Sequence, residues 1–318
     1  MLSVRALDAK NGVLYFDGFK DSPLELHLYA IDLNSDTASP RRLTEGSGWH
    51  ETTVGTEGKL WVDVYSTPTT PPAIRLFAEN GRKVADLSTA RDSSAAETSG
   101  QPTIGSFTGP DGSELYYRLR LPKEARLGQK CPAVIYVYGG PGAQVVQRRW
   151  LPRAEAIESR LVDAGFVVMA LDNRGSPHRG KRFEGVLKHN FAGAELEDQA
   201  AGARWLQQQD YVDGERIGIC GASYGGYMTL MALLREPSLY KVGVSIAPVT
   251  DWLLYDTHYT ERYLGYPDAN AEIYDKCAVL TYVEGLTGKL LVIHGMADDN
   301  VLYTHSTKLY APIELAPQ

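Results

Sequence analysis

In the second half of this chain the sequence reads Ile217-Gly-Ile-Cys-Gly-Ala-Ser-Tyr-Gly-Gly-Tyr-Met228. A short apolar run precedes the glycine and serine residues, and an alanine- and leucine-rich run to Leu234 follows them. This order predicts a strand, a sharp turn and a helix, with Ser223 at the turn. Gly221 and Gly225 flank the serine because helix and strand pass too close there for a Cβ. The stretch predicts a nucleophilic serine, although a structural glycine turn with an idle serine would have the same spacing.

Composition and charge exclude several classes of protein. The 318 residues are 43% hydrophobic and 22% charged, as in ordinary globular proteins with room for one large domain and a smaller one. The net charge of −7 is spread along the chain without a basic block, which argues against a nucleic-acid partner. The longest apolar runs have the length of strands, so no membrane span is expected. The N-terminus lacks the apolar core of a secretory signal, and both a periplasmic and a cytoplasmic location stay open.

The cysteines indicate no cofactor. Cys131, Cys220 and Cys277 are odd in number and widely spaced, which is typical neither of a disulfide framework nor of a metal site. Two of them lie in or beside apolar strands, where cysteine behaves as a small buried side chain. We therefore expect neither a metal nor another cofactor.

Residues 1–96 are predicted to be all-β. Short β-branched or aromatic runs alternate there with turn dipeptides such as Asn11-Gly12 and Asn80-Gly81. The expected strands are Gly12–Phe16, His27–Leu33, Lys59–Tyr65 and Ala73–Phe77. A region of this length makes about two blades of a β-propeller, which normally closes with at least four, so it is interpreted as an incomplete propeller. A polar segment of small residues, 89–100, marks its end.

Residues 97–318 are predicted to alternate strands with helices, as in a doubly wound parallel sheet. The expected strands are Ala133–Tyr138, Phe166–Leu171, Ile217–Cys220, Val242–Ile246 and Leu290–Ile293, with Ser113–Leu121 as an edge hairpin strand. The expected helices include Ala154–Ala164 and Glu195–Gln209. Sites in such folds form at the carboxyl ends of strands. The chemically suggestive residues fall there: Tyr138–Gly140, Asp172–Gly175, Ser223 and Asp298–Asn300. This agreement indicates an α/β-hydrolase.

Two kinds of group would complete the chemistry of Ser223. In the α/β-hydrolase order an acid and then a histidine follow the nucleophile. Asp298 comes directly after the last apolar strand and is favoured over Asp299 as the acid, the alternative being two solvated loop carboxylates. Charge on a substrate oxygen needs fixed donors. The backbone N–H of Tyr224 is one, and the phenol of Tyr138 is a second, although Tyr138 could equally be a tyrosine at the edge of the core.

No histidine in the sequence suits the role of the base. The base should lie beyond another strand after the acid, yet only residues 299–318 follow Asp298. His294 belongs to the strand end beside the acid, His258 precedes the acid, and His305 is expected on the surface of the next helix. A serine without its base is a weak nucleophile. The chain by itself is therefore predicted to be almost inert.

Several segments resemble the prolyl oligopeptidase family of serine peptidases. They are Gly221–Tyr227, Tyr136–Pro141, Asp172–Gly175 and His294–Val301, and the long segment Ala247–Gly265 is similar to the dipeptidyl peptidase IV branch. The resemblance implies that residues 1–96 are the closing blades of a propeller and that residues 97–318 are most of the peptidase domain. It also implies peptide substrates with proline or alanine at the second position, and family members often form homodimers.

The resemblance implies a role for individual residues. By position Ser223 matches the nucleophile, Asp298 the acid and Tyr138 the side-chain oxyanion donor. The residues that match a hydrophobic pocket for proline are Tyr224, Val249, Trp252, Tyr255, Tyr259 and Val301, and Asn300 matches a residue that polarises the substrate carbonyl. Flat aromatic and branched side chains suit a pyrrolidine ring. Without the resemblance, ordinary core packing would also explain these aromatic residues.

The departures from the family leave alternatives open. The glutamates that grip the substrate N-terminus, the final strand, the catalytic histidine and the last helix have no counterpart in this sequence, and the ending Ala311–Gln318 departs from the helix expected there. Met1 could be an internal methionine. We interpret the chain as part of a peptidase that releases N-terminal dipeptides. The alternatives are a non-catalytic relative serving as a binding or dimerisation module, and another enzyme of this fold, such as an acylaminoacyl peptidase or esterase.

Overall fold

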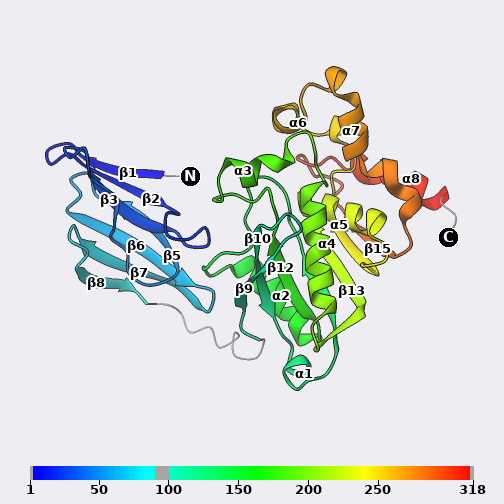
Figure 1. Cartoon of the computed structure of the whole chain (residues 1–318), viewed down its shortest axis with the longest axis horizontal. Helices are drawn as coiled ribbons and strands as arrows, with labels where there is room; N and C mark the ends of the chain where they lie inside the picture. Colours follow the sequence, from blue (N-terminus) through cyan, green and yellow to red (C-terminus); the bar gives the residue numbers. More distant parts are fainter. Residues whose placement is uncertain (1–2, 90–99, 316–318) are drawn as a thin grey trace. The chain divides into compact units, whose positions relative to one another are not determined.

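The chain forms two compact units in the computed structural model, which describes residues 3–89 and 100–315 (Figure 1). One unit comprises Met1–Pro102 with Gln147–Ser159, and the other comprises Thr103–Val146 with Arg160–Gln318. The predicted domain boundary between residues 96 and 97 lies outside the described residues, as do residues 90–99 of the polar segment.

The first unit consists of two antiparallel four-stranded sheets, ordered β1-β2-β3-β4 and β5-β6-β7-β8. The strands are β1 Ser3–Asp8, β2 Val13–Gly18, β3 His27–Asp32, β4 Arg41–Arg42, β5 Trp49–Val54, β6 Leu60–Thr67, β7 Thr70–Ala78 and β8 Lys83–Ser88. A common core joins the two sheets, with Leu28 and Trp61 almost fully buried in it. Two four-stranded antiparallel sheets are the make-up of propeller blades, which confirms the prediction of a partial β-propeller.

Four strands of this unit were not predicted from the sequence. Strand β5 shows why, because it contains the polar run Glu51-Thr52-Thr53. Its side chains alternate between buried and exposed positions, but the polar residues do not predict a strand from the sequence. Only its pairing with β6 shows that it is one. Strands at the outer edge of a sheet need fewer apolar residues than inner ones.

The second unit is built on a seven-stranded sheet with the order β15-β14-β13-β11-β12-β10-β9. Its strands are β9 Thr103–Thr108, β10 Glu114–Arg120, β11 Cys131–Tyr136, β12 Val167–Asp172, β13 Val212–Ala222, β14 Val242–Ile246 and β15 Lys289–Ile293. The strands from β15 to β12 pair in parallel, as predicted for an α/β-hydrolase. The prediction that Ser113–Leu121 is an edge strand was wrong, because β10 pairs with both β12 and β9.

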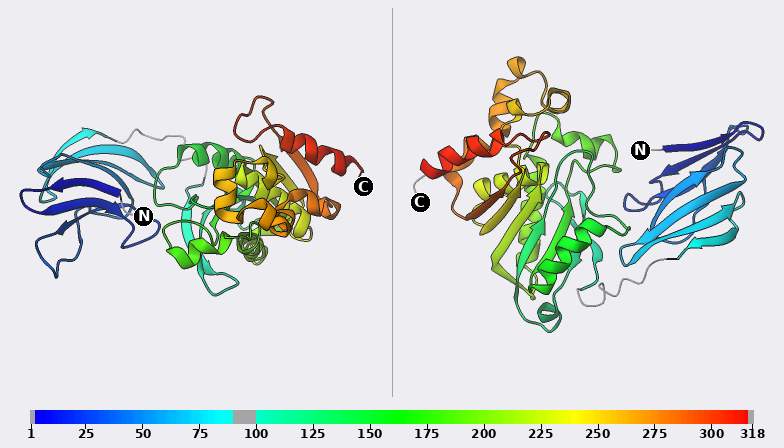
Figure 2. Two further views of the ribbon diagram at one scale, coloured as in Figure 1. Left: turned by 90° about the horizontal axis from the view of Figure 1, so that it is seen from above. Right: turned by 180° about the vertical axis from the view of Figure 1, so that it is seen from behind.

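Helices cover this sheet, and α4 and α5 lie side by side on one face of it (Figures 1 and 2). The helices of the chain are α1 Lys123–Arg126, α2 Pro152–Asp163, α3 Lys181–Glu184, α4 Ala194–Gln207, α5 Tyr224–Arg235, α6 Thr257–Leu264, α7 Ala271–Cys277 and α8 Thr304–Leu315. Short 3-10 helices are η2 Gly185–Leu187, η3 Trp252–Leu254, η4 Pro267–Ala269 and η5 Val279–Gly285. Every residue of α5 from Tyr224 to Leu234 is buried, so this helix is the centre of the unit.

The end of the described chain differs from the expectation. Helix α8 continues through Pro312 to Leu315, although Ala311–Gln318 was expected to depart from a helix. Pro312 removes one backbone donor, and its ring crowds the carbonyl four residues earlier in the helix. None of the helices in the described ranges combines the length and the apolar character that crossing a bilayer requires.

Candidate active site

Ser223 lies at a strained turn between β13 and α5. Its backbone has φ 58° and ψ −120°, a conformation that side-chain-bearing residues rarely adopt and that marks functional strain when the surroundings hold it. The N–H of Ser223 donates to the carbonyl oxygen of Ile246 at 2.8 Å, and its own carbonyl accepts from Tyr227 N–H at 3.0 Å. The side chain is half-buried. The turn thus presents a serine oxygen at the carboxyl end of a central strand.

The flanking glycines are required by the close approach of neighbouring backbone. A Cβ on either Gly221 or Gly225 would collide with the carbonyl oxygen of Val137, which follows β11. A Cβ on Gly225 would also lie 3.1 Å from the Cα of Tyr138. Backbone atoms cannot swing aside as a flexible side chain can. The structure therefore confirms that neighbouring backbone passes too close to these two positions for a Cβ, as inferred from the sequence.

Tyr138 and Tyr224 lie next to each other beside this turn. Their ring centroids are 6.1 Å apart, and Tyr224 is the first residue of α5. The first N–H groups of a helix have no partner within the helix, so the Tyr224 N–H is available to a substrate oxygen. Burial, with smaller contributions from Tyr255 and Tyr263, raises the pKa of the Tyr138 phenol above its usual range. The phenol therefore keeps its proton at neutral pH and can donate it in a hydrogen bond.

The strand-end residues Asp172 and Asn173 support the segment that carries Tyr138. Asp172 Oδ1 accepts the N–H groups of Val145 and Val146 at 2.7 and 3.1 Å. Asn173 Nδ2 donates to the carbonyl oxygen of Gly139 at 3.0 Å. The chain from Gly139 to Val146 is thus fastened to the end of β12. These residues hold other parts of the site in place, and the next one, Arg174, forms a buried ion pair with Asp198 at 2.8 Å.

An aromatic cluster adjoins Ser223. Trp252 lies at its centre and is 1% exposed, with ring centroids of Tyr224, Tyr255 and Tyr259 at 5.6, 5.9 and 6.2 Å. The sequence-predicted valines Val249 and Val301 are buried in the same hydrophobic core. Tyr255 and Tyr259 are only partly buried, so the cluster keeps an accessible side. The structure therefore brings together the four aromatic residues that the resemblance implied for a proline pocket, and their role as a pocket stays a prediction.

The acid loop follows β15. Asp298 Oδ1 accepts the N–H groups of Asn300 and Val301 at 3.0 and 2.9 Å, and its Oδ2 lies 3.7 Å from Nε2 of His294. Asn300 Oδ1 accepts the hydroxyl of Tyr255 at 3.3 Å, so this loop touches the aromatic cluster. Asp299 is exposed. The loop thus holds Asp298 in place, and its role as the acid stays a prediction.

No histidine reaches the nucleophile. All seven histidines lie in the described ranges, and within those ranges none hydrogen-bonds Ser223. His294 Nδ1 contacts the Ser306 hydroxyl at 2.6 Å and Nε2 contacts the Val301 carbonyl at 2.7 Å, so both ring nitrogens are engaged. The prediction that His305 lies on the surface was wrong. His305 is fully buried and its Nδ1 accepts Thr250 N–H at 3.1 Å.

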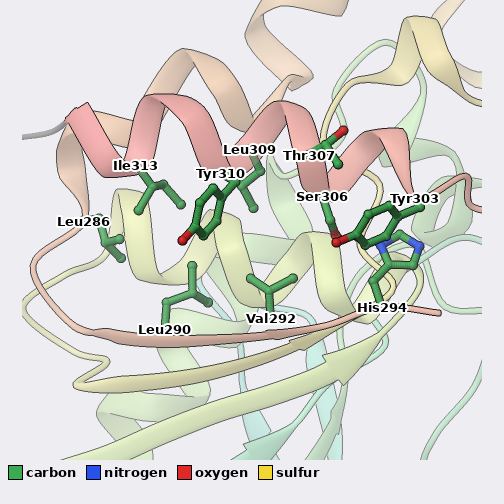
Figure 3. A pocket seen from close by; sticks show the side chains of 10 residues that line it. All are labelled: Leu286, Leu290, Val292, His294, Tyr303, Ser306, Thr307, Leu309, Tyr310 and Ile313. Carbon is green, nitrogen blue, oxygen red and sulfur yellow. The ribbon is translucent and has the colours of Figure 1, made fainter. Parts of the chain in front are cut away.

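An apolar cavity of about 600 Å³ lies between β15 and α8 (Figure 3). Leu290 and Val292 point into it from β15, and Leu309, Tyr310 and Ile313 face them from the helix. His294, Tyr303 and Ser306 line the end nearest the acid loop. Among the described residues β15 pairs only with β14, so it is an edge strand of the sheet.

Two buried residues of the site were not found from the sequence. The ring of Phe191 lies 4.7 Å from that of Trp252 and 5.3 Å from that of Tyr224, which makes it part of the aromatic cluster. Glu195 Oε1 accepts the hydroxyl of Tyr224 at 2.9 Å. Burial raises the pKa of Glu195 to about 7. In the sequence Glu195 had appeared only as one of the acidic residues that begin a helix, and that pattern carries no sign of burial.

Comparison with known proteins assigns the chain to a family. The model of the prolyl oligopeptidase family matches residues 154–316, and that of the dipeptidyl peptidase IV N-terminal region matches residues 2–72. The first match alone covers half of the chain. The chain belongs to the prolyl oligopeptidase family. The recognition made from the sequence motifs is thereby confirmed.

Relatives within the prolyl oligopeptidase family match almost the whole chain. Dipeptidyl peptidase 8 of Mus musculus is 35% identical over 315 residues, which are 95% of this chain and 35% of the mouse protein. A probable dipeptidyl-aminopeptidase B of Neurospora crassa is 31% identical over 96% of this chain and 33% of its own length. The chain therefore spans about a third of the length of these curated relatives.

Solved structures agree with this assignment. A putative dipeptidyl aminopeptidase IV from Bacteroides ovatus has a TM-score of 0.90 and 31% identity, covering 98% of this chain and 44% of that chain. Dipeptidyl peptidase 4 of Porphyromonas gingivalis also has a TM-score of 0.90, with 29% identity over 99% of this chain and 44% of that chain. A partial propeller followed by an α/β-hydrolase is thus the fold of this family member.

Proposed function

We propose that the protein is a serine-type peptidase that releases N-terminal dipeptides with proline or alanine at the second position. The observation that carries the proposal is the strained backbone of Ser223 at the strand-to-helix turn, beside an aromatic cluster. The names of its relatives, dipeptidyl peptidase and dipeptidyl-aminopeptidase, support the same reaction class. We also propose the division into propeller blades over residues 1–96 and a peptidase domain over residues 97–318.

The proposed reaction proceeds through an ester on Ser223. The serine oxygen loses its proton to the base and attacks the carbonyl carbon of the second substrate residue, and the nitrogen of the third residue leaves with that proton. The negative oxygen that forms is stabilised by the Tyr224 N–H and the Tyr138 phenol, two donors fixed before the reaction begins. Water then hydrolyses the ester and frees the dipeptide. Asp298 would orient the base that moves the protons.

The aromatic cluster supports proline or alanine at the second position. The rings of Tyr224, Trp252 and Tyr259 pack against one another and offer an apolar surface with little to hydrogen-bond, which suits a compact ring without a free N–H. Alanine is small enough to enter the same space. Larger side chains would have to displace rings that pack against one another.

We propose that the 318-residue polypeptide by itself is inactive, because none of the histidines in its described ranges reaches Ser223. In the proposed enzyme a histidine from a segment beyond Gln318 would meet Asp298, since the family order places the histidine after the acid. Strand β15, which leads to the loop that carries Asp298, is an edge strand of the described sheet and suits pairing with a further strand. The rival proposal, a non-catalytic binding or dimerisation module, is favoured by the same missing contact.

The test uses the polypeptide of 318 residues and the full product of its source gene. Hydrolysis of glycyl-prolyl-p-nitroanilide is expected only with a longer product that supplies a histidine after Asp298. In that product Ser223→Ala should lower kcat by about 10⁴-fold or more, and Ser238→Ala, at an exposed serine beyond α5, should leave it unchanged. A source gene that ends at Gln318, or a full product inert towards the substrate, would favour the binding module. Turnover that survives Ser223→Ala would refute the nucleophile.

A further inference from the structure

A buried carboxylate joins the wall of the aromatic cluster to the loop beneath it. Glu195 is fully buried near the start of α4. Its Oε1 accepts the Tyr224 hydroxyl at 2.9 Å and the Ala192 N–H at 2.5 Å, and its Oε2 accepts the Gly193 N–H at 3.1 Å. Within residues 3–89 and 100–315 no cation forms an ion pair with it. Three donors therefore replace water around this carboxylate.

The two backbone donors, the N–H groups of Ala192 and Gly193, belong to a turn with an unfavourable backbone conformation, which their hydrogen bonds to Glu195 stabilise. Ala192 has φ 53°, in the left-handed region that costs a non-glycine residue about 1 kcal/mol or more. The residue before it is Phe191, whose ring contacts those of Trp252 and Tyr224. The carboxylate of Glu195 thus decides where the Phe191 ring lies. A carboxylate that served only to cap α4 would need no contact with α5.

The third donor is the hydroxyl of Tyr224, whose ring packs edge-to-face against that of Phe191 at 5.3 Å. Tyr224 is 2% exposed, and its ring lies between those of Tyr138 and Trp252 at 6.1 and 5.6 Å. Its hydroxyl donates to Glu195, so the ring is held at its far end as well as at the backbone. A buried hydroxyl without an acceptor is costly, and Tyr224 would turn to find another one. One carboxylate therefore sets the positions of two rings on two different elements.

We propose that Glu195 is the positioning residue that shapes the proline pocket, by holding the Tyr224 ring and the turn that carries Phe191 in place. The proposal rests on the proposed function, because it names what limits the same pocket to a five-membered ring. Glu195 does not touch the substrate. It acts through the two rings, and a side chain that cannot accept all three hydrogen bonds holds them less firmly in position.

The test measures ring selectivity and the state of Tyr224 in the same samples. Protein with ¹³Cζ-labelled tyrosine is compared as wild type and as Glu195→Gln, which keeps the size of the side chain but loses one acceptor. The Tyr224 signal is assigned through Tyr224→Phe. Binding of alanyl-pyrrolidine and alanyl-piperidine is followed in the same spectra. The wild type is expected to bind the pyrrolidine compound about tenfold or more tightly, the range for one extra methylene in an apolar pocket.

Glu195→Gln is expected to shift the Tyr224 signal and to reduce this selectivity to less than about threefold, chiefly by admitting the larger ring. The control is Glu197→Gln on the same helix, where the side chain is 64% exposed and pairs with Arg174, and both readouts should stay as in the wild type. If Glu195→Gln fails to fold, Tyr224→Phe removes only the hydroxyl and should lower the selectivity in the same way.

The outcomes separate the two proposals. A wild type that does not distinguish the two rings contradicts the proline pocket, and with it the proposed function. A wild type that distinguishes them, together with a Glu195→Gln or Tyr224→Phe variant that distinguishes them equally well, overturns the role of Glu195 alone. Equal loss of selectivity in Glu197→Gln would also overturn it, because the effect would then follow from any change of charge on α4.

Discussion

The two halves of the candidate site are supported very differently. On the nucleophile side, Ser223 follows the central strand β13 and begins α5, whose residues from Tyr224 to Leu234 are all buried. On the acid side, Asp298 follows the edge strand β15, where Leu291 is 54% exposed. A central strand has a neighbour on each side, whereas an edge strand has one. The contrast shows that Ser223 is held by the buried centre of the unit, whereas Asp298 follows an edge strand with exposed apolar side chains.

The largest difference between the two sides is expected when one methyl group is added to a glycine on each side. Gly225→Ala would drive a Cβ into the backbone of Val137 and should cost about 4 kcal/mol or prevent folding of the second unit. Gly295→Ala on the acid side meets no atom within 4 Å, and its free energy of unfolding should stay within about 1 kcal/mol of the wild type. Urea unfolding of both variants measures the difference. Equal effects would contradict the contrast.

A smaller effect is expected from the buried charge on the nucleophile side. Burial raises the pKa of Glu195 from 4.5 to about 7, so the folded protein holds that proton more strongly than the unfolded chain does. Stability from this group is complete below about pH 4.5 and is lost as the pH rises towards 7. The free energy of unfolding of the wild type should therefore fall relative to that of Glu195→Gln, by up to about 3 kcal/mol at about 1.4 kcal/mol for each pKa unit.

Urea unfolding at several pH values between 4.5 and 8 checks this, with the difference between the two proteins as the readout. Asp172, whose pKa burial also raises to about 7, contributes to both curves and cancels in that difference. Parallel curves for the wild type and Glu195→Gln would show that the carboxylate does not titrate as its burial implies.

The smallest effect on stability is expected from the two neighbouring carboxylates, Asp298 and Asp299. Asp298→Ala removes the acceptor of two backbone N–H groups in a loop that is partly open to water, so a loss of about 1 kcal/mol in unfolding free energy is expected. Asp299→Ala, at the exposed neighbour, should change it by less than about 0.5 kcal/mol. Urea unfolding distinguishes them. A larger loss from Asp299→Ala would contradict the view that Asp298 is the carboxylate that holds this loop.

Much of the site could be predicted because its residues stand at strand ends. Ser223, Tyr138 and Asp298 each follow an apolar run, and parallel strands bring their carboxyl ends to one edge. Gly221 and Gly225, which flank Ser223, predicted the tight turn between strand and helix. The position of β10 inside the sheet could not be predicted, because its partner β9 is a polar and glycine-containing strand that only pairing reveals.

The burial of single charged residues could not be predicted either. Glu195 and His305 lie on helices, where sequence periodicity gives a face but not what packs against it. His305 is buried because its Nδ1 accepts a backbone N–H from the loop that leads to Trp252. That loop is far from His305 in the sequence.

The sequence by itself determined the α/β-hydrolase order, the propeller-like start and the nucleophile turn, because local periodicity and glycine placement follow from backbone geometry. Only the tertiary structure decided which carboxylate accepts the Tyr224 hydroxyl and which strand forms the edge of the sheet. Hydrogen bonds between α4 and α5, and the place of β15 at the edge of the sheet, depend on elements that meet only when the chain has folded.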